Sequence, residues 1–180
     1  MQIDSPLIVT VAIDEETSSF FNALRKQYFP PALNYIDAHL TLFHHLPSNE
    51  STILDDLQKW STAYAPIPLQ ITEIKSIGKG VAYKIDSPAL SQLHRTMQTK
   101  WKRWLTPQDS QKLWPHITVQ NKVPPAQAKE TLQILQASFQ PFTATALGFE
   151  LWAYKGGPWE YVNTFLFKRN SLFFPEQKRK

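Results

Sequence analysis

Hydrophobic and polar positions along this chain fall into runs of two kinds, and the order of these runs predicts the fold. Short apolar runs rich in β-branched residues predict strands, and apolar residues every three or four positions predict helices. The expected strands cover about 7–13, 39–42, 67–77, 81–85, 116–119, 142–154 and 161–167, and the expected helices about 15–28, a stretch from 50–52 on, 88–104 and a stretch from 124–125 on. The order is strand, helix, strand, helix, strand, taken twice, with one more strand at the end.

A tetrapeptide pattern recurs at the middle of each predicted half. The two copies are His39-Leu40-Thr41-Leu42 and His116-Ile117-Thr118-Val119. Side chains alternate between the faces of a strand, so each His shares a face with its Thr, while Leu40 and Ile117 point into the core. The recurrence predicts a duplicated architecture in which the two copies form two arms of one site.

Composition narrows the class of protein without naming a ligand. The 180 residues are 42% apolar and 13% aromatic, which is enough for a core without covalent cross-links. The chain has no cysteine, which excludes disulfides, thiol catalysis and thiolate metal sites. Its net charge of +4 is compatible with an anionic ligand but does not by itself indicate nucleic acid.

The expected location is the cytoplasm, with no membrane association. The first residues lack the basic start of a secretory signal, and the apolar run 7–13 is too short to span a bilayer. The absence of cysteine fits a reducing compartment.

Two histidines paired with two hydroxyls fit transfer at a phosphate. In-line displacement at phosphorus needs a base on the attacking oxygen and an acid on the leaving oxygen, and imidazole, with a reference pKa of about 6.5, can serve as either. Threonine hydroxyls can bind the non-bridging oxygens and stabilise their charge. This scheme requires no metal and no cofactor.

The paired motifs, with Pro115 directly before the second one, resemble the two-histidine phosphoesterase superfamily, which includes 2'-5' RNA ligase-like proteins and RNA 2',3'-cyclic phosphodiesterases. The resemblance covers most of the chain. It implies one α+β domain over residues 1–180, a bilobal duplicated fold with two antiparallel sheets, flanking helices and a central cleft. It implies that His39 and His116 are the catalytic pair and that Thr41 and Thr118 bind the phosphate.

The activity that this resemblance implies is metal-independent hydrolysis of a cyclic phosphodiester to a 2'-phosphate. The substrate would be an RNA end or a small nucleotide with a cyclic phosphate, and no obligatory protein partner is implied. In the family the first histidine is usually drawn as the acid and the second as the base, although pseudo-symmetry lets the two exchange roles.

Two segments depart from the better-known relatives. Many of those carry an arginine soon after the second motif, where this chain continues Val119-Gln120-Asn121-Lys122. The first motif runs into Phe43-His44-His45-Leu46-Pro47, which suggests a distinct subgroup. His44 should face away from His39 in a regular strand, so a surface or loop-end role is favoured over a metal site.

Other candidates have ordinary interpretations beside the functional ones. Gln120 and Lys122 would continue the His116 face, as Phe43 and His45 would continue that of His39. These positions could line the cleft, or could form exposed strand ends. His94 is expected to be structural or exposed. The turn 154–160 could stack a nucleobase, but a hairpin with a packed tryptophan is the commoner explanation.

Three alternatives to a cyclic phosphodiesterase remain at this point. The arms could belong to two ordinary strands with half-buried histidines. The cleft could serve a non-catalytic module that binds an RNA end or phosphorylated ligand, although binding alone would not need paired proton-transfer groups. A 2'-5' RNA ligase is the third, but the chain has no Gly-rich phosphate loop to support nucleotide-dependent ligation.

Overall fold

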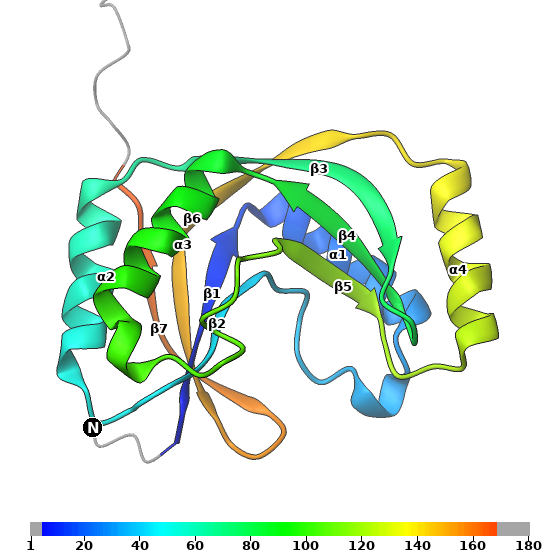
Figure 1. The fold of residues 1–180 in the computed structure, drawn as a ribbon. Coiled ribbons are helices and arrows are strands. Elements are labelled where there is room, and N and C mark those ends of the chain that lie inside the picture. The colour runs from blue at the N-terminus through cyan, green and yellow to red at the C-terminus, as the bar shows by residue number, and fades with distance from the viewer. Residues whose placement is uncertain (1–4, 169–180) are drawn as a thin grey trace, which may run out of the picture.

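The structure is a computed structural model that describes residues 5–168. It is an α+β fold in which seven antiparallel strands and four α-helices follow one another in the predicted order (Figure 1). The elements are β1 (Leu7–Ile13), α1 (Glu15–Tyr28), β2 (Thr41–Leu46), α2 (Ser51–Ala63), β3 (Ile67–Ser76), β4 (Val81–Asp86), α3 (Pro88–Trp101), β5 (His116–Gln120), α4 (Pro125–Ala137), β6 (Phe142–Tyr154) and β7 (Trp159–Leu166). Short 3-10 turns follow α1 at Pro31–Leu33 and α3 at Lys102–Trp104.

The strands form one sheet where two were expected. The order is β2-β1-β6-β3-β4-β5, and β7 also pairs with β6. The reason lies in β6, whose first residues pair with β3 while its later residues pair with β1 on one side and β7 on the other. One strand of 13 residues thereby joins both halves of the sheet.

The strands that contain all or part of the repeated motifs, β2 and β5, lie at opposite ends of this strand order. Figure 1 shows a strongly curved sheet, with β2 and β5 facing each other across the middle of the molecule. Sheets twist because of backbone chirality, and a long central strand accumulates that twist. The curvature is what allows two edge strands to contribute to one site.

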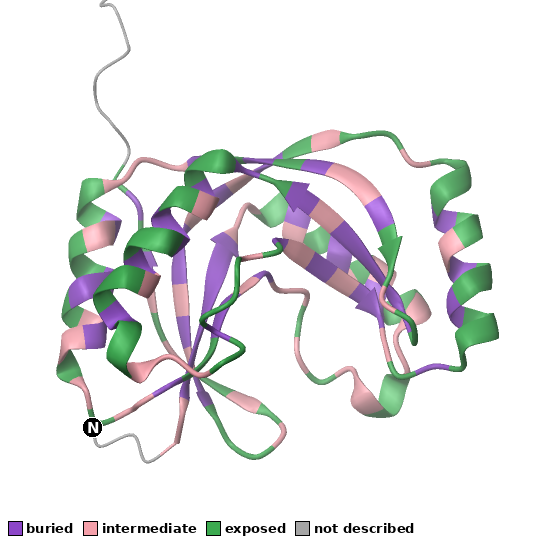
Figure 2. Ribbon diagram, viewed as in Figure 1, coloured by how far each residue is buried: buried purple, intermediate pink, exposed green. Residues whose placement is uncertain are grey.

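Helices cover both halves of the sheet and supply most of its packing. α2 packs on β6 and β7, α3 on β3, α4 on β3 and β4, and α1 on β5. The largest fully buried side chains include Trp101, Phe21, Phe43 and Phe149. Figure 2 shows the buried positions running along the strands and on the helix sides that face them.

Side-chain caps fix where two of the helices begin. Asp14 accepts the N–H of Thr17 at the start of α1, and its second carboxylate oxygen accepts the N–H of Thr145 in β6. Ser87 caps α3 in the same way, with Pro88 as the first helical residue. Such caps satisfy N–H groups that the helix itself leaves unpaired. No helix within residues 5–168 is long and apolar enough to cross a membrane.

Candidate active site

Each repeated motif lies where a loop enters a strand. His116 is the first residue of β5, whereas His39 lies two residues before β2 begins at Thr41. Leu40 and Ile117 are 0% and 1% exposed, so the prediction that they point into the core is confirmed. The burial of these neighbours anchors each motif and leaves its His and Thr partly accessible.

Both motif histidines use the same backbone contact. Nδ1 of His39 lies 2.7 Å from the carbonyl oxygen of Asp37, and Nδ1 of His116 lies 2.7 Å from the carbonyl oxygen of Trp114. A carbonyl oxygen only accepts hydrogen bonds, so Nδ1 must carry the proton in each ring. The neutral tautomer therefore leaves Nε2 of both histidines with a free lone pair, which is the form that a general base needs.

A tryptophan packs against each of these imidazoles. The ring of His116 stacks on Trp114 at 4.2 Å between centroids, and the ring of His39 lies 4.6 Å from that of Trp159. Trp159 lies in the predicted turn 154–160 and is the first residue of β7, and it also contacts Trp152. The predicted hairpin with a packed tryptophan is confirmed, and sequence patterning did not show that its partner would be His39.

Burial lowers the pKa of both motif histidines. The pKa of His39 falls to about 4, chiefly because its ring is desolvated, and the nearby charges of Arg25, His116 and His44 lower it further. Desolvation also lowers the pKa of His116, with a further contribution from His44. Both rings are therefore mainly neutral at neutral pH in the free protein, and a bound anion would favour their protonated forms.

Arg25 of α1 connects the two motif regions from within the protein. It is 4% exposed, and its guanidinium donates to the side chain of Asn34, the carbonyl of Ile36 and the carbonyl of Thr118. It also lies over the ring of Phe29. One buried side chain thus holds the loop before the first motif and the strand of the second. Sequence patterning missed it because its burial depends on tertiary packing.

A bulge in β2 changes which residues share a face. Thr41 pairs with Thr10 of β1, but the next pair joins Phe43 to Val9, so one extra residue is inserted after Thr41. A bulge reverses the alternation of side chains beyond it. The expectation that His44 faces away from the site is therefore wrong, because His44 lies on the face of Thr41. The expectation that Phe43 lines the cleft or an exposed strand end is wrong for the same reason, because Phe43 is fully buried.

The same irregularity occurs directly after the second motif. Thr118 pairs with Ala82, and the next pair joins Gln120 to Val81. Gln120 consequently faces the other side, where it is fully buried and donates to Thr131 of α4. The interpretation of Gln120 as a cleft residue or an exposed strand end is wrong for this reason. Lys122 lies beyond β5 and lines a different pocket together with Pro124.

A cavity of about 340 Å³ opens between β2 and the segment 108–116. Thr41, His44 and His116 all line it, so the structure brings parts of both motifs to one place. His39 is close enough for the charge of His116 to act on it, although its side chain is not part of the cavity wall. Thr118 is likewise outside the wall, and its carbonyl is bound by Arg25.

His94 lines this cavity and has a structural role. It is 2% exposed, stacks on Phe43 and bonds the carbonyl of Leu42 through Nε2. That bond holds the bulged part of β2 against α3. Of the two expectations for His94, structural or exposed, the structural one holds.

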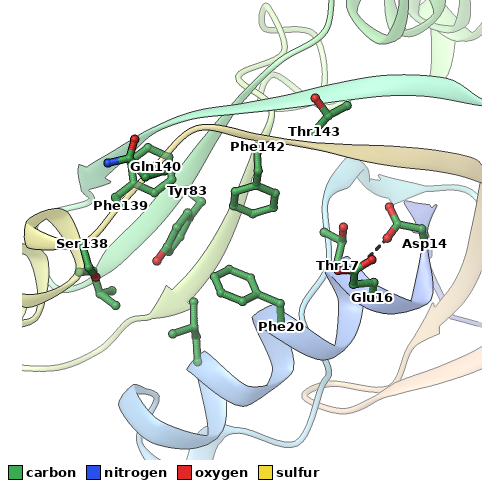
Figure 3. A pocket seen from close by; sticks show the side chains of 12 residues that line it. Asp14, Glu16, Thr17, Phe20, Tyr83, Ser138, Phe139, Gln140, Phe142 and Thr143 are labelled. Carbon is green, nitrogen blue, oxygen red and sulfur yellow. Dashed lines mark hydrogen bonds between the residues drawn. The ribbon is translucent and has the colours of Figure 1, made fainter.

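A larger cavity lies elsewhere in the molecule. It has a volume of about 560 Å³ and is lined between α1 and α4 by aromatic side chains, among them Phe20, Tyr83, Phe139 and Phe142 (Figure 3). None of the four motif residues lines it. Within residues 5–168, no three His, Asp or Glu side chains form a group that could hold a metal ion.

Comparison with known proteins places the chain in a family. A sequence profile of the 2'-5' RNA ligase superfamily matches residues 13–158, which contain both motifs. The chain belongs to the 2'-5' RNA ligase superfamily. No curated protein sequence matches this superfamily member significantly.

Solved structures share the fold of this superfamily member. TT0787 of Thermus thermophilus has a TM-score of 0.62 at 15% identity, and E. coli LigT complexed with 3'-AMP has 0.61 at 16%. A third structure, described as a phosphoesterase, has 0.58 at 16%. Each alignment covers 92% of this chain and 99% of the other, so the whole architecture is shared.

Proposed function

We propose that this protein hydrolyses a cyclic phosphodiester, the 2',3'-cyclic phosphate of an RNA end or small nucleotide, without a metal ion. The observation that carries the proposal is the tautomer that His39 and His116 share. In each of them Nδ1 is bonded to a backbone carbonyl, so Nε2 is free. A module that only binds phosphate needs donors, whereas this arrangement prepares two Nε2 atoms for proton transfer. We therefore favour an enzyme over a binding module.

The two imidazoles can accept and donate every proton that the hydrolysis requires, without any other group. The neutral Nε2 of one histidine takes a proton from water as the water oxygen bonds to phosphorus. The protonated Nε2 of the other gives its proton to the ribose oxygen as the bond between that oxygen and phosphorus breaks. The enzyme ends with its single proton on the opposite histidine, and exchange with solvent restores the starting state.

The family resemblance makes His39 the acid and His116 the base, and the low pKa of His39 is compatible with this. Once protonated, a group with a pKa of about 4 is a stronger acid than an ordinary imidazolium and donates readily to a leaving alkoxide. The negative phosphate supplies the charge that favours protonation when substrate binds. We assign Thr41 and Thr118 to the non-bridging oxygens, which their hydroxyls can bind.

The relatives support a nucleotide end as the substrate. E. coli LigT has been solved with 3'-AMP, with phosphate and with ATP, so nucleotide ligands occur in proteins of this fold. The turn 154–160 and Trp114, which is 42% exposed, would place indole surfaces beside the reacting phosphate. Nucleobases stack on such surfaces.

The proposal is tested by a screen for hydrolysis. Nucleoside 2',3'-cyclic phosphates, oligoribonucleotides with cyclic ends and ADP-ribose 1'',2''-cyclic phosphate are incubated with the protein, and products are separated by chromatography against 2'- and 3'-phosphate standards. We expect turnover of at least one substrate to a 2'-phosphate. If the protein binds some of these compounds but hydrolyses none of them, the result would favour the binding module.

A further inference from the structure

His44 is a third imidazole on the cavity that Thr41 and His116 line. Its side chain is 47% exposed, so the ring is not part of the core. Resting on the proposed function, we propose that His44 binds the substrate, contacting a phosphate oxygen through Nε2 beside the site of proton transfer. The bulge after Thr41 is the feature that turns this residue into the cavity.

A buried carboxylate fixes the orientation of the His44 ring. Asp109 is 3% exposed, and one of its oxygens lies 3.0 Å from Nδ1 of His44. The same carboxylate accepts the backbone N–H groups of His44 and His45. Burial alone would raise the pKa of Asp109, but these hydrogen bonds outweigh it and lower that pKa. Asp109 is therefore ionised, Nδ1 of His44 must donate to it, and Nε2 is the nitrogen left for a ligand.

The fold holds Asp109 itself in place from two sides. The hydroxyl of Thr106 accepts its backbone N–H, and Gln98 of α3 donates to its backbone carbonyl. A ligand-binding side chain gains precision when such supporting contacts fix its rotamer. The backbone N–H groups of His44 and His45 bond this carboxylate to β2, and the further bond to Nδ1 fixes the half-exposed ring of His44.

The remaining polar groups of the cavity suit an anion. Lys112, Gln108 and Gln111 supply donors along the segment that faces His44. Among the described residues that form the wall, Asp109 is the only carboxylate, and its oxygens are already engaged by His44 and His45. With Nδ1 bonded to Asp109 and Nε2 open to a phosphate oxygen, the ring of His44 would lie between two anions.

The test separates a substrate contact from a structural one. His44→Asn keeps a side-chain N–H near the position of Nδ1, so the bond to Asp109 can persist, while Nε2 is removed. His45→Ala is the matched control, because His45 gives Asp109 only its backbone N–H and its ring does not line the cavity. The measurements are kcat and KM on the preferred cyclic phosphate, and the Kd of 2'-AMP and of inorganic phosphate by calorimetry.

We expect His44→Asn to lower kcat/KM and to weaken 2'-AMP and phosphate binding by about tenfold or more, as for the loss of one charge-assisted hydrogen bond. Thermal unfolding should be close to wild type, and His45→Ala should change no parameter beyond about twofold. Wild-type kinetics and affinities in His44→Asn would overturn the inference while leaving the two-histidine mechanism intact. If the wild-type protein hydrolyses no cyclic phosphate, the proposed function fails, but a selective loss of affinity in His44→Asn still supports this contact.

Discussion

At the residue scale, the backbone determines the protonation pattern of the two motif histidines. The carbonyls of Asp37 and Trp114 fix the tautomers of His39 and His116 without adding a negative charge. A carboxylate in that position would stabilise an imidazolium, whereas a carbonyl does so less, and burial lowers both pKa values. Both imidazoles are therefore mainly neutral in the free protein at neutral pH, and in the proposed reaction the bound phosphate would favour protonation of one of them.

The pH dependence should follow from these shifts. The proposed reaction needs one protonated and one neutral imidazole, and kcat/KM reports the free enzyme. Because both pKa values are lowered, kcat/KM should fall with rising pH from a midpoint below about 6.5, the reference value for histidine. The profile of kcat should lie at higher pH, since bound phosphate raises both values. Steady-state profiles between about pH 4 and 9 would check this, and a descending limb of kcat/KM whose midpoint lies above about pH 7 would contradict it.

At the element scale, bulges in β2 and β5 determine which side chains face the site. Each motif strand carries a bulge directly after its threonine, and the bulge sends His44 into the cavity on β2 and Gln120 into the core on β5. Helix α1 adds Arg25, whose three hydrogen bonds reach the regions of both motifs. The relative position of the two motifs therefore depends on a helix that contains neither.

Replacement of Arg25 should test that dependence. In Arg25→Lys an ammonium cannot reach the three acceptors that the planar guanidinium spans, so buried acceptors lose their donors. We expect the free energy of unfolding to fall by about 1–3 kcal/mol in denaturant titrations, and kcat/KM to fall as well. The exposed neighbour Lys26, replaced by Ala, is the control and should change stability by less than about 0.5 kcal/mol. An Arg25→Lys protein with wild-type stability and activity would show that the connection is dispensable.

At the scale of the whole molecule, a single curved sheet brings distant parts of the chain together. β2 and β5 are at opposite ends of the strand order, yet Thr41 and His116 line one cavity. The continuous strand β6 holds the two halves in register. In the proposed reaction, the imidazoles and hydroxyls of the two motifs supply proton transfer and charge stabilisation from protein groups alone.

Hydrolysis should therefore persist after exhaustive chelation. Dialysis against EDTA followed by an assay in metal-free buffer should leave kcat within about twofold of the untreated protein, because the two imidazoles act without a Lewis acid. Loss of activity on chelation, with recovery on adding a divalent ion, would show that a metal takes part. His44 and His45 would then need to be tested as ligands.

The sequence predicted much of this architecture because the relevant signals are local. Periodicity gave the order of the elements, and the alternation of faces correctly buried Leu40 and Ile117. The single sheet was not predicted, because strand pairing through β6 is a long-range property. His44 and Gln120 were placed on the wrong faces, because alternation assumes a regular strand and a bulge leaves no clear sequence signal. The contact of Trp159 with His39 likewise arises only from tertiary packing.

The central claim is that His39 and His116 form one proton-transfer pair, and their separate replacement tests it most directly. On the preferred 2',3'-cyclic phosphate, His39→Ala and His116→Ala should each lower kcat by at least about 100-fold, the low end for the loss of a general acid or base. Circular dichroism should show that both histidine variants are folded. Thr41→Ala and Thr118→Ala should lower kcat by a smaller factor than the histidine replacements. A folded His116→Ala protein with nearly full turnover would contradict the two-histidine mechanism.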